Sequence, residues 1–234
     1  MRTGAVCLAA GRGKRMESMV HKQYMLLNGK PVIYYSLKAF QESGIDEITL
    51  VVPPGEEEYC KNMVVEKYNF SKVKHIISGG KERYHSVSKG LSTLRQVDYV
   101  LIHDGARPFL TGEIIERSIQ GAVESGACVV GMPVKDTIKI ADQEYNIAVT
   151  PDRNLVWQIQ TPQSFSYPII HRAYQLLEEA EGKGGLENLS VTDDAMVVEH
   201  FMNHRVKLIK GSYRNIKITT PEDMLIAEVF LHKQ

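Results

Sequence analysis

The sequence predicts an α/β protein with a doubly wound, mostly parallel, Rossmann-like sheet from which a β-hairpin arm projects. Apolar runs alternate with stretches of helical periodicity up to Met132, a pattern typical of parallel strands joined by crossover helices. The first apolar run opens into a glycine-rich loop at Gly11 and Gly13, which suits the ligand-binding edge of such a sheet. The alternation stops after Pro133, and this change predicts the arm.

The part of the chain up to Met132 supplies most of the predicted sheet. A continuous apolar run predicts a first strand that is buried on both faces, and turn residues close several later strands. The predicted strands cover residues 5–10, 47–52, 73–77, 99–102 and 127–132. Apolar residues recur at helical spacing between them, as at positions 33, 37 and 40. The predicted helices cover residues 31–40, 56–68, 84–94 and 112–124.

The pattern after Pro133 predicts a hairpin and then a return to helices. Two short strands are expected at 136–140 and 145–149 around a turn at 141–144. An isolated hairpin is marginally stable in water, so this arm, at about residues 133–155, needs a partner within the chain or from another copy. Later elements are expected as helices at 168–181 and 192–202, strands at 205–209 and 215–218, and a last helix that begins at Thr220-Pro-Glu-Asp223 with Thr as the N-cap. We expect residues 1–234 to form a single domain that carries the arm.

Bulk composition limits the class of protein. The chain has 234 residues, 43% hydrophobic and 24% charged, and its 28 basic and 28 acidic side chains leave no formal net charge. This balance argues against a general binder of nucleic acids or anionic membranes. The odd number of cysteines, Cys7, Cys60 and Cys128, suggests reduced core thiols. With no secretory signal region and no long apolar run, we expect a cytoplasmic protein.

The loop after the first strand is the strongest chemical signal in the sequence. Gly11 and Gly13 allow close approach of backbone N–H groups to a ligand, and Arg12, Lys14, Arg15 and Lys22 supply positive charge nearby. These features predict a phosphate-binding loop more strongly than a solvated turn. The spacing is neither that of a P-loop nor that of a complete dinucleotide fingerprint.

Three further segments are candidates for binding. Asp104 follows a buried strand and is suited to Mg²⁺, and Arg107 offers a fork for phosphate; a local cap paired with Arg107 explains them equally well. The Gly79-Gly80 turn with Ser86 suits a flat base or is a plain turn. Lys217 is a lone lysine in a predicted strand, which is most often solvated. The histidines show no paired metal-ligand spacing, and no Gly-x-Ser-x-Gly elbow is present.

Taken together, these motifs resemble the 2-C-methyl-D-erythritol 4-phosphate cytidylyltransferases of the non-mevalonate isoprenoid pathway. The resemblance rests on segments that occur in the family's order along nearly the whole chain. They are Ala9-Ala-Gly-Arg-Gly-Lys-Arg-Met16, Lys22-Gln-Tyr24, Gly79-Gly80-x-x-Arg83-x-x-Ser86-Val87, His103-Asp-Gly-Ala-Arg-Pro108, Asp136-Thr137, Asp152-Arg-Asn154, Thr161-Pro-Gln163, Thr192-Asp193 and Asn215-Ile-Lys217. The family's nucleotidyltransferase-type fold with a dimerising β-arm agrees with the sheet and hairpin predicted above.

The resemblance implies an activity and a set of site residues. The activity is transfer of CMP from CTP to 2-C-methyl-D-erythritol 4-phosphate, with Mg²⁺ or another divalent cation, by a homodimer whose arms reach the partner's site. By resemblance, the cytidine half is held by Ala9, Ala10, Gly11, Gly80 and Ser86, the triphosphate by Arg15, Lys22 and Lys217, the metal by Asp104, and the methylerythritol phosphate by Arg107, Thr137, Arg153 and Thr161. Nucleic acid and membrane are not expected partners.

Two departures and several rival readings accompany the resemblance. Lys81 stands where an acidic residue can occur, and Arg12 sits at a variable loop position. A ribitol 5-phosphate cytidylyltransferase has the same kind of fold, arm and chemistry, although the Ala-Ala-Gly opening favours the methylerythritol group. A sugar-1-phosphate nucleotidyltransferase is a more distant alternative, and a non-catalytic nucleotide-binding module is an alternative of another class. A dehydrogenase is disfavoured because the dinucleotide fingerprint is incomplete.

Overall fold

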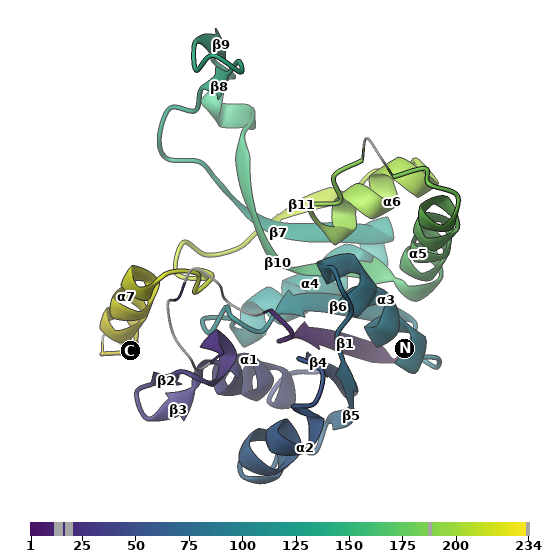
Figure 1. Ribbon diagram of the computed structural model, residues 1–234, viewed down its shortest axis with the longest axis vertical. Coiled ribbons are helices and arrows are strands. Elements are labelled where there is room, and N and C mark those ends of the chain that lie inside the picture. The colour runs from purple at the N-terminus through teal and green to yellow at the C-terminus, as the bar shows by residue number, and fades with distance from the viewer. Residues whose placement is uncertain (12–15, 17–20, 187–188, 233–234) are drawn as a thin grey trace.

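The computed structural model describes residues 1–11, 16, 21–186 and 189–232. Its centre is a seven-stranded sheet in the order β11-β7-β10-β6-β1-β4-β5, shown in Figure 1. The strands are β1 (Thr3–Leu8), β4 (Glu47–Val52), β5 (Val73–Ser78), β6 (Tyr99–Asp104), β7 (Ala127–Pro133), β10 (Trp157–Ser166) and β11 (Lys207–Lys210). Neighbouring strands are parallel except at β10, which runs antiparallel to β6 and β7. The predicted mostly parallel sheet is therefore confirmed.

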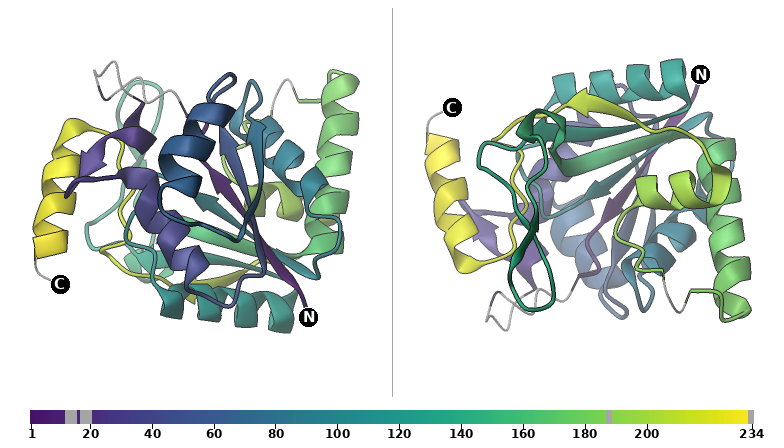
Figure 2. Two further views of the ribbon diagram at one scale, coloured as in Figure 1. Left: turned by 90° about the horizontal axis from the view of Figure 1, so that it is seen from below. Right: turned by 90° about the horizontal axis from the view of Figure 1, so that it is seen from above.

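Helices cover both faces of this sheet, as Figures 1 and 2 show. One face carries α1 (Val32–Gln41), α2 (Glu57–Cys60) with its π-helical continuation (Lys61–Glu66), and α4 (Gly112–Ser125); the other carries α3 (Arg83–Thr93), α5 (Tyr167–Gly182) and α6 (Asp194–Met202). Successive side chains of a strand point to opposite faces, and helices cover both faces of the sheet, so strand β1 is buried on both sides. Cys7 packs in the cluster under α1, whereas Val6 packs in the cluster under α3. The doubly wound arrangement is confirmed.

Strand β10 was not predicted. Its sequence contains Thr161-Pro162 and several glutamines, and proline together with poor apolar alternation argues against a central strand. The chain accommodates them with a register shift against β7 between Ile159 and Gln163. Most of its buried polar side chains are hydrogen-bonded within the fold; for example, Gln163 accepts the backbone N–H groups of Asp194 and Ala195, whereas the buried hydroxyl of Ser164 has no partner among the described residues. Hydrogen bonds to distant parts of the chain therefore stabilise a strand that the local sequence pattern does not predict.

Two segments differ from the elements expected in the C-terminal part and after the first loop. Residues 215–218 form no strand; they are an extended segment in which the N–H of Ile218 donates to the carbonyl of Ala106. A small hairpin of β2 (Leu26–Leu27) and β3 (Lys30–Pro31) follows a 3-10 turn (Lys22–Tyr24) and was not anticipated. These short pieces have too few residues to show a periodic pattern, so only tertiary contacts define them.

The arm projects between the ends of β7 and β10, away from the sheet (Figure 1). Its hairpin, β8 (Ile140–Ala141) and β9 (Ile147–Val149), is shorter than predicted, and a 3-10 turn (Arg153–Leu155) follows it. Several apolar side chains of the arm are exposed, including Tyr145 at 92%, Leu155 at 79% and Ile147 at 64%. Exposure of this kind is typical of a surface that another molecule covers.

The last helix, α7 (Pro221–His232), starts where the capping signal predicted. The carboxylate of Asp223 accepts the backbone N–H groups of Thr219 and Thr220, which is the acidic half of a capping box. Ala227 and neighbouring apolar residues pack against Leu27 and Phe109. This contact anchors the chain after β11 beside the ends of β1 and β6. In the described ranges, no helix combines the length and apolar character needed to span a membrane.

Candidate active site

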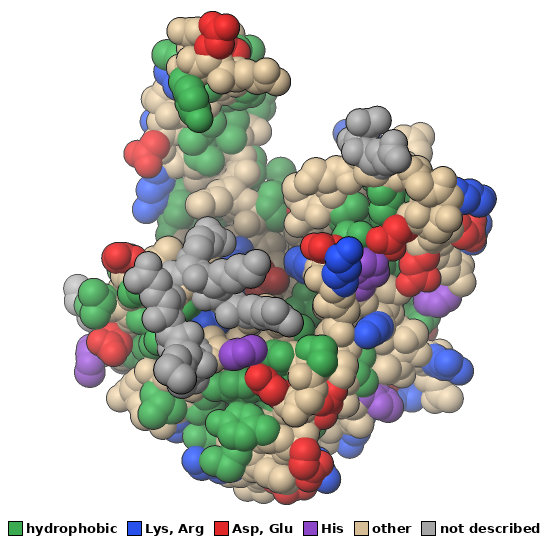
Figure 3. Space-filling model, in the orientation of Figure 1, with side chains coloured by type: hydrophobic (Ala, Val, Ile, Leu, Met, Phe, Trp, Pro, Cys, Tyr) green, Lys and Arg blue, Asp and Glu red, His purple; other side chains and the backbone are tan. Residues whose placement is uncertain are grey.

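A cleft of about 1230 Å³ lies at the carboxyl ends of β1, β4, β5 and β6, the edge where ligands bind in such sheets. Figure 3 shows acidic and basic side chains next to one another in the middle of this face, below the arm. The cleft is lined by residues from these strand ends and from the C-terminal segment: Leu8, Ala9, Ala10, Gly11, His21, Lys22, Gln23, Pro53, Pro54, Glu56, Gly79, Gly80, Lys81, Glu82, Arg83, Ser86, Lys89, Asp104, Ala106 and Lys217.

The residues assigned by resemblance to the cytidine half of CTP all line this cleft: Ala9, Ala10, Gly11, Gly80 and Ser86. The Ser86 hydroxyl accepts the N–H of Gly80 at 2.9 Å and is 5% exposed. A Cβ on Gly80 would lie 2.3 Å from the Cβ of His85, so this turn has no room for a larger residue. The structure thus brings these residues together in the cleft, at a turn where Gly80 leaves the backbone uncovered by a side chain.

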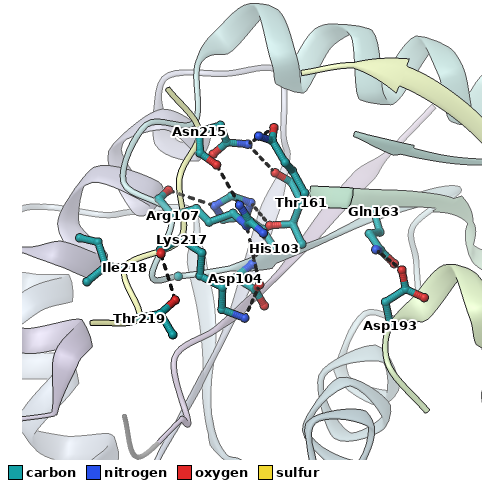
Figure 4. Close-up of polar contacts among 12 residues, drawn as sticks. His103, Asp104, Arg107, Thr161, Gln163, Asp193, Asn215, Lys217, Ile218 and Thr219 are labelled. Carbon is teal, nitrogen blue, oxygen red and sulfur yellow. Dashed lines mark hydrogen bonds and ion pairs between the residues drawn. The ribbon is translucent and has the colours of Figure 1, made fainter. Parts of the chain in front are cut away.

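Asp104, the last residue of β6, is the centre of charge in the cleft. Its carboxylate lies 2.8 Å from the Lys217 ammonium, 3.6 Å from Arg83 Nε and 3.8 Å from Arg107 Nε. Figure 4 shows the contact with Lys217. Burial raises the pKa of Asp104, but the charges of Arg83, Lys217 and Arg107 outweigh it and hold that pKa well below its usual range. Asp104 is therefore ionised, and Lys217 is not the solvated lysine that its sequence context alone would favour.

Lys22 approaches the same region from the other side of the cleft. The 3-10 turn that carries it is fixed by its neighbour Gln23, which is 1% exposed. The Lys22 ammonium donates to the carbonyl of Ile218 at 3.1 Å, one residue after Lys217. The two lysines assigned to the triphosphate are thus brought together by the segment between β11 and α7. Arg15, the third residue of that group, lies outside the described residues, as do Arg12 and Lys14.

Beneath Asp104, a hydrogen-bonded chain connects β6 to β10. Thr161 accepts the N–H of Asp104 at 3.1 Å, and its hydroxyl lies 2.9 Å from Nδ1 of His103. Nε2 of His103 faces the carbonyl of Arg107 at 3.4 Å. Burial lowers the pKa of His103 to about 4, so the ring is neutral, with Nε2 as donor and Nδ1 as acceptor of the Thr161 hydroxyl proton. This chain fixes the backbone at Asp104.

The residues assigned to the methylerythritol phosphate do not all meet in one chain. Thr161 is buried at 4% exposure, and Arg107 donates to the carbonyl of Asn215 at 2.8 Å (Figure 4); both adjoin Asp104. Thr137 and Arg153 are exposed on the arm, where Arg153 donates to the carbonyl of Lys135. None of the four is among the residues that line the described cleft, but Arg107 and Thr161 lie beside Asp104, whereas Thr137 and Arg153 lie apart from it on the arm.

Comparison with known proteins agrees with this geometry. A family model described as IspD, 2-C-methyl-D-erythritol 4-phosphate cytidylyltransferase, matches residues 3–233. The chain belongs to this family. A 2-C-methyl-D-erythritol 4-phosphate cytidylyltransferase from Lachnospira eligens is 53% identical over 97% of this chain and 98% of that protein. One from Lachnoclostridium phytofermentans is 48% identical over 98% of this chain and 96% of that protein.

Solved structures of the cytidylyltransferase family share the fold. The crystal structure of 4-diphosphocytidyl-2C-methyl-D-erythritol synthase from Anaerococcus prevotii has a TM-score of 0.85 at 33% identity and covers 99% of this chain and 96% of that chain. A 2-C-methyl-D-erythritol 4-phosphate cytidylyltransferase from Thermus thermophilus has a TM-score of 0.75 at 28% identity and covers 97% of this chain and 98% of that chain. Both the family resemblance and the fold class predicted from sequence are confirmed.

The structure places three functional candidates in this cytidylyltransferase that sequence reasoning did not assign. Arg83 lies between Asp104 and Asp194, and His103 supports the backbone at Asp104. Arg83 and His103 stand inside motifs that carried the resemblance, but a motif does not say what a side chain contacts. Asp194 begins α6 beside the N-cap Asp193, and two acids at a helix start are most simply explained by capping. Asp194, however, is fully buried, and its carboxylate pairs with the guanidinium of Arg83.

Asp104 is the residue that the family resemblance assigns to a metal ion. Among the described residues, no group of three or more His, Cys, Asp or Glu side chains could hold one. The carboxylate of Asp104 is ionised, but it is already paired with the ammonium of Lys217. Mg²⁺ is often held through one or two carboxylates together with phosphate oxygens and water. The residues fit a metal in that shared mode, in which a triphosphate supplies most of the ligands.

Protonation of His103 is expected to make folding stability pH-dependent. Its folded pKa of about 4 lies below the ordinary 6.5, so the unfolded chain binds the proton first as pH falls. The free energy of unfolding should therefore decrease between about pH 6.5 and pH 4, by about 3 kcal/mol from this group. His103→Gln removes this contribution. Urea unfolding at pH 7 and pH 4 should show a larger loss for the wild type than for the variant; equal losses would contradict the assignment.

Proposed function

We propose that this chain transfers CMP from CTP to 2-C-methyl-D-erythritol 4-phosphate, giving 4-diphosphocytidyl-2-C-methyl-D-erythritol and pyrophosphate. The observation that carries the proposal is the cleft in which Lys22, Lys217 and Asp104 meet beside the Gly80 turn. Relatives that match almost the whole chain are named for this substrate. The described cleft residues do not distinguish this substrate from ribitol phosphate, which is therefore an arm of the test.

The proposed reaction is an in-line substitution at phosphorus. A phosphate oxygen of methylerythritol phosphate forms a bond to the α-phosphorus of CTP, the bond from that phosphorus to the bridging oxygen breaks, and pyrophosphate leaves with its electron pair. The attacking phosphate is already an anion near neutral pH, so no general base is required. Because two anions must meet, the task of the protein is positioning and charge stabilisation.

Lys22 and Lys217 are proposed to provide that stabilisation. Both are held by contacts with fixed groups, Lys22 to the carbonyl of Ile218 and Lys217 to Asp104. Preorganised cations of this kind act without further reorganisation when charge builds on the phosphate oxygens. Arg15 stays a prediction from the family resemblance for the same group. Ala9, Ala10, Gly11, Gly80 and Ser86 are proposed to bind the cytidine half, largely through backbone groups and close approach.

A divalent cation, Mg²⁺ by proposal, would be shared between Asp104 and the triphosphate. Bound there, it would neutralise charge on the phosphate oxygens. Chelation with EDTA is expected to abolish pyrophosphate release, and added Mg²⁺ should restore it. Because the described residues offer no metal site of their own, Mg²⁺ without CTP should leave the thermal unfolding midpoint unchanged. Turnover in EDTA would refute the metal requirement, and a metal-induced rise in that midpoint would refute the shared mode.

We also propose a homodimer in which the arm completes the partner's site. The exposed apolar side chains of the arm and the position of Thr137 and Arg153 outside their own cleft support this arrangement. Light scattering coupled to gel filtration should give the mass of a dimer, and a monomer would contradict it. A cytoplasmic location is proposed as well, supported by Cys7, Cys60 and Cys128, which are free and buried.

The activity is tested by pyrophosphate release with Mg²⁺ and CTP, offering methylerythritol phosphate and ribitol phosphate in separate reactions. Turnover with the first substrate alone is expected. Turnover with ribitol phosphate alone would overturn the substrate and leave the nucleotide site in place. Absence of turnover with both would favour a non-catalytic nucleotide-binding module.

A further inference from the structure

Arg83, the first residue of α3, connects two carboxylates with a single guanidinium group. Its Nη1 and Nη2 donate to Oδ1 and Oδ2 of Asp194 at 2.8 and 2.7 Å. Its Nε lies 3.6 Å from Oδ1 of Asp104. The guanidinium is planar and carries its donors in a fixed fork. Once Asp194 holds both Nη groups, the direction of the Nε edge is set as well.

Asp194 is a rigid anchor for this fork. It is fully buried, with 0% exposure, and the hydroxyl of Tyr174 donates to its Oδ1 at 2.6 Å. Its backbone N–H donates to the side chain of Gln163 at 2.9 Å, and Gln163 in turn donates to the N-cap Asp193. Side chains of α3 and α5 therefore hold this carboxylate, and β10 holds the backbone of the residue that carries it. A buried charge so thoroughly hydrogen-bonded has one position.

Lys217, by contrast, has little local support. It lies between Asn215 and Thr219 in a segment without helix or strand, and its side chain is 39% exposed, against 12% for Asp104. A lysine side chain has four flexible carbons and many rotamers, so its contact with Asp104 at 2.8 Å decides where the ammonium lies. Whatever fixes the carboxylate of Asp104 also fixes Lys217.

We infer that Arg83 is a positioning residue, which transmits the fixed geometry of Asp194 to Asp104 and thereby to Lys217. The inference deepens the proposed function and rests on it, because Lys217 acts there on the triphosphate. By this inference α6 and β10 also affect the transfer site, because they carry and hold Asp194. Neither Asp194 nor Gln163 lines the described cleft. Lysine at position 83 would keep the charge but could not contact both carboxylates with fork geometry.

Steady-state kinetics test the inference in wild type, Arg83→Lys, Asp194→Asn and the double variant. We expect kcat to fall about 10–100-fold in each single variant, because a misplaced Lys217 ammonium slows the transfer step. The KM for CTP should change little. The double variant should be no worse than the poorer single variant. Tyr174→Phe, which removes a single donor to Asp194, is a milder second variant with a smaller loss in kcat. Arg172→Gln, which breaks an exposed pair on α5, is the control and should match wild type.

The alternatives give different results. A raised KM for CTP in Arg83→Lys, with unchanged kcat in Asp194→Asn, would show that Arg83 contacts the nucleotide directly and would overturn the inference. Full kcat with only a lowered unfolding midpoint would show a purely structural role and overturn it too. A stability cycle of Arg83→Lys and Lys217→Ala in urea tests the same link without turnover. Non-additive effects support the link even if the proposed activity fails, and additive effects refute it.

Discussion

Replacing Lys22 with alanine is expected to lower kcat by about 10²–10³-fold, the usual cost of removing one preorganised donor from a charged transition state. Lys22 lines the cleft and donates to the carbonyl of Ile218 at 3.1 Å, next to Lys217. The folded structure should survive, because the turn is held by Gln23, which is buried at 1% exposure. The measurement is pyrophosphate release at saturating CTP and methylerythritol phosphate, with thermal unfolding in parallel.

The matched control for Lys22→Ala is Lys72→Ala. Lys72 also donates from a partly buried side chain to a backbone carbonyl, that of Ser43, but it does not line the cleft. Lys72→Ala should therefore keep the wild-type kcat while losing a comparable hydrogen bond. A Lys22→Ala protein with kcat within a few-fold of wild type would remove Lys22 from the proposed stabilising group.

Replacing Arg153 with alanine is expected to lower kcat/KM for methylerythritol phosphate by about 10–100-fold, because a hydrogen bond to a charged group contributes about 1.5–3 kcal/mol. Arg153 lies on the exposed arm and does not line the cleft of its own chain. In the proposed homodimer it reaches the partner's cleft instead. Initial rates at varied methylerythritol phosphate measure the effect, which should leave the KM for CTP nearly unchanged.

Mixing two impaired variants shows which subunit Arg153 serves. Arg153→Ala and Lys217→Ala chains are unfolded together and refolded as an equal mixture. If Arg153 acts on the partner's site, each mixed dimer contains one intact site, and the mixture should recover about one quarter of wild-type activity. If Arg153 acts within its own chain, no intact site forms and the mixture shows no more activity than the average of the two variants refolded alone. Each variant refolded alone serves as the control.

Much of the sheet could be predicted from sequence because its signals are local, whereas most of the first loop lies outside the described residues, so its phosphate-binding role stays a prediction. The run from Ala5 to Ala10 is apolar throughout, so it predicts a strand buried on both faces, and Val6 and Cys7 do face opposite clusters. Gly80 could be placed in a tight turn after a strand, and the structure gives the reason, since a Cβ there would meet His85. The order of the motifs along the chain was sufficient to recognise the family.

Strand β10 and the charge arrangement around Asp104 could not be predicted in the same way. β10 contains Thr161-Pro162, and most of its buried polar side chains have partners distant in sequence; the side-chain amide of Asn215, for example, donates to Oε1 of Gln160. Hydrogen bonds of this kind leave no periodic pattern. The same holds for Lys217, whose sequence context suggests an exposed lysine although it contacts Asp104 at 2.8 Å.

The sequence by itself therefore determined the fold class, the edge of the sheet at which the cleft lies, and the family, because backbone preference and residue order are properties of short segments. Only the tertiary structure decided which charges act together. Arg83, Asp104, Asp194 and Lys217 come from α3, β6, α6 and the segment before α7, and their ion pairs exist only when the sheet brings these elements together. Electrostatic energy depends on distance and burial, and neither can be read from separation along the chain.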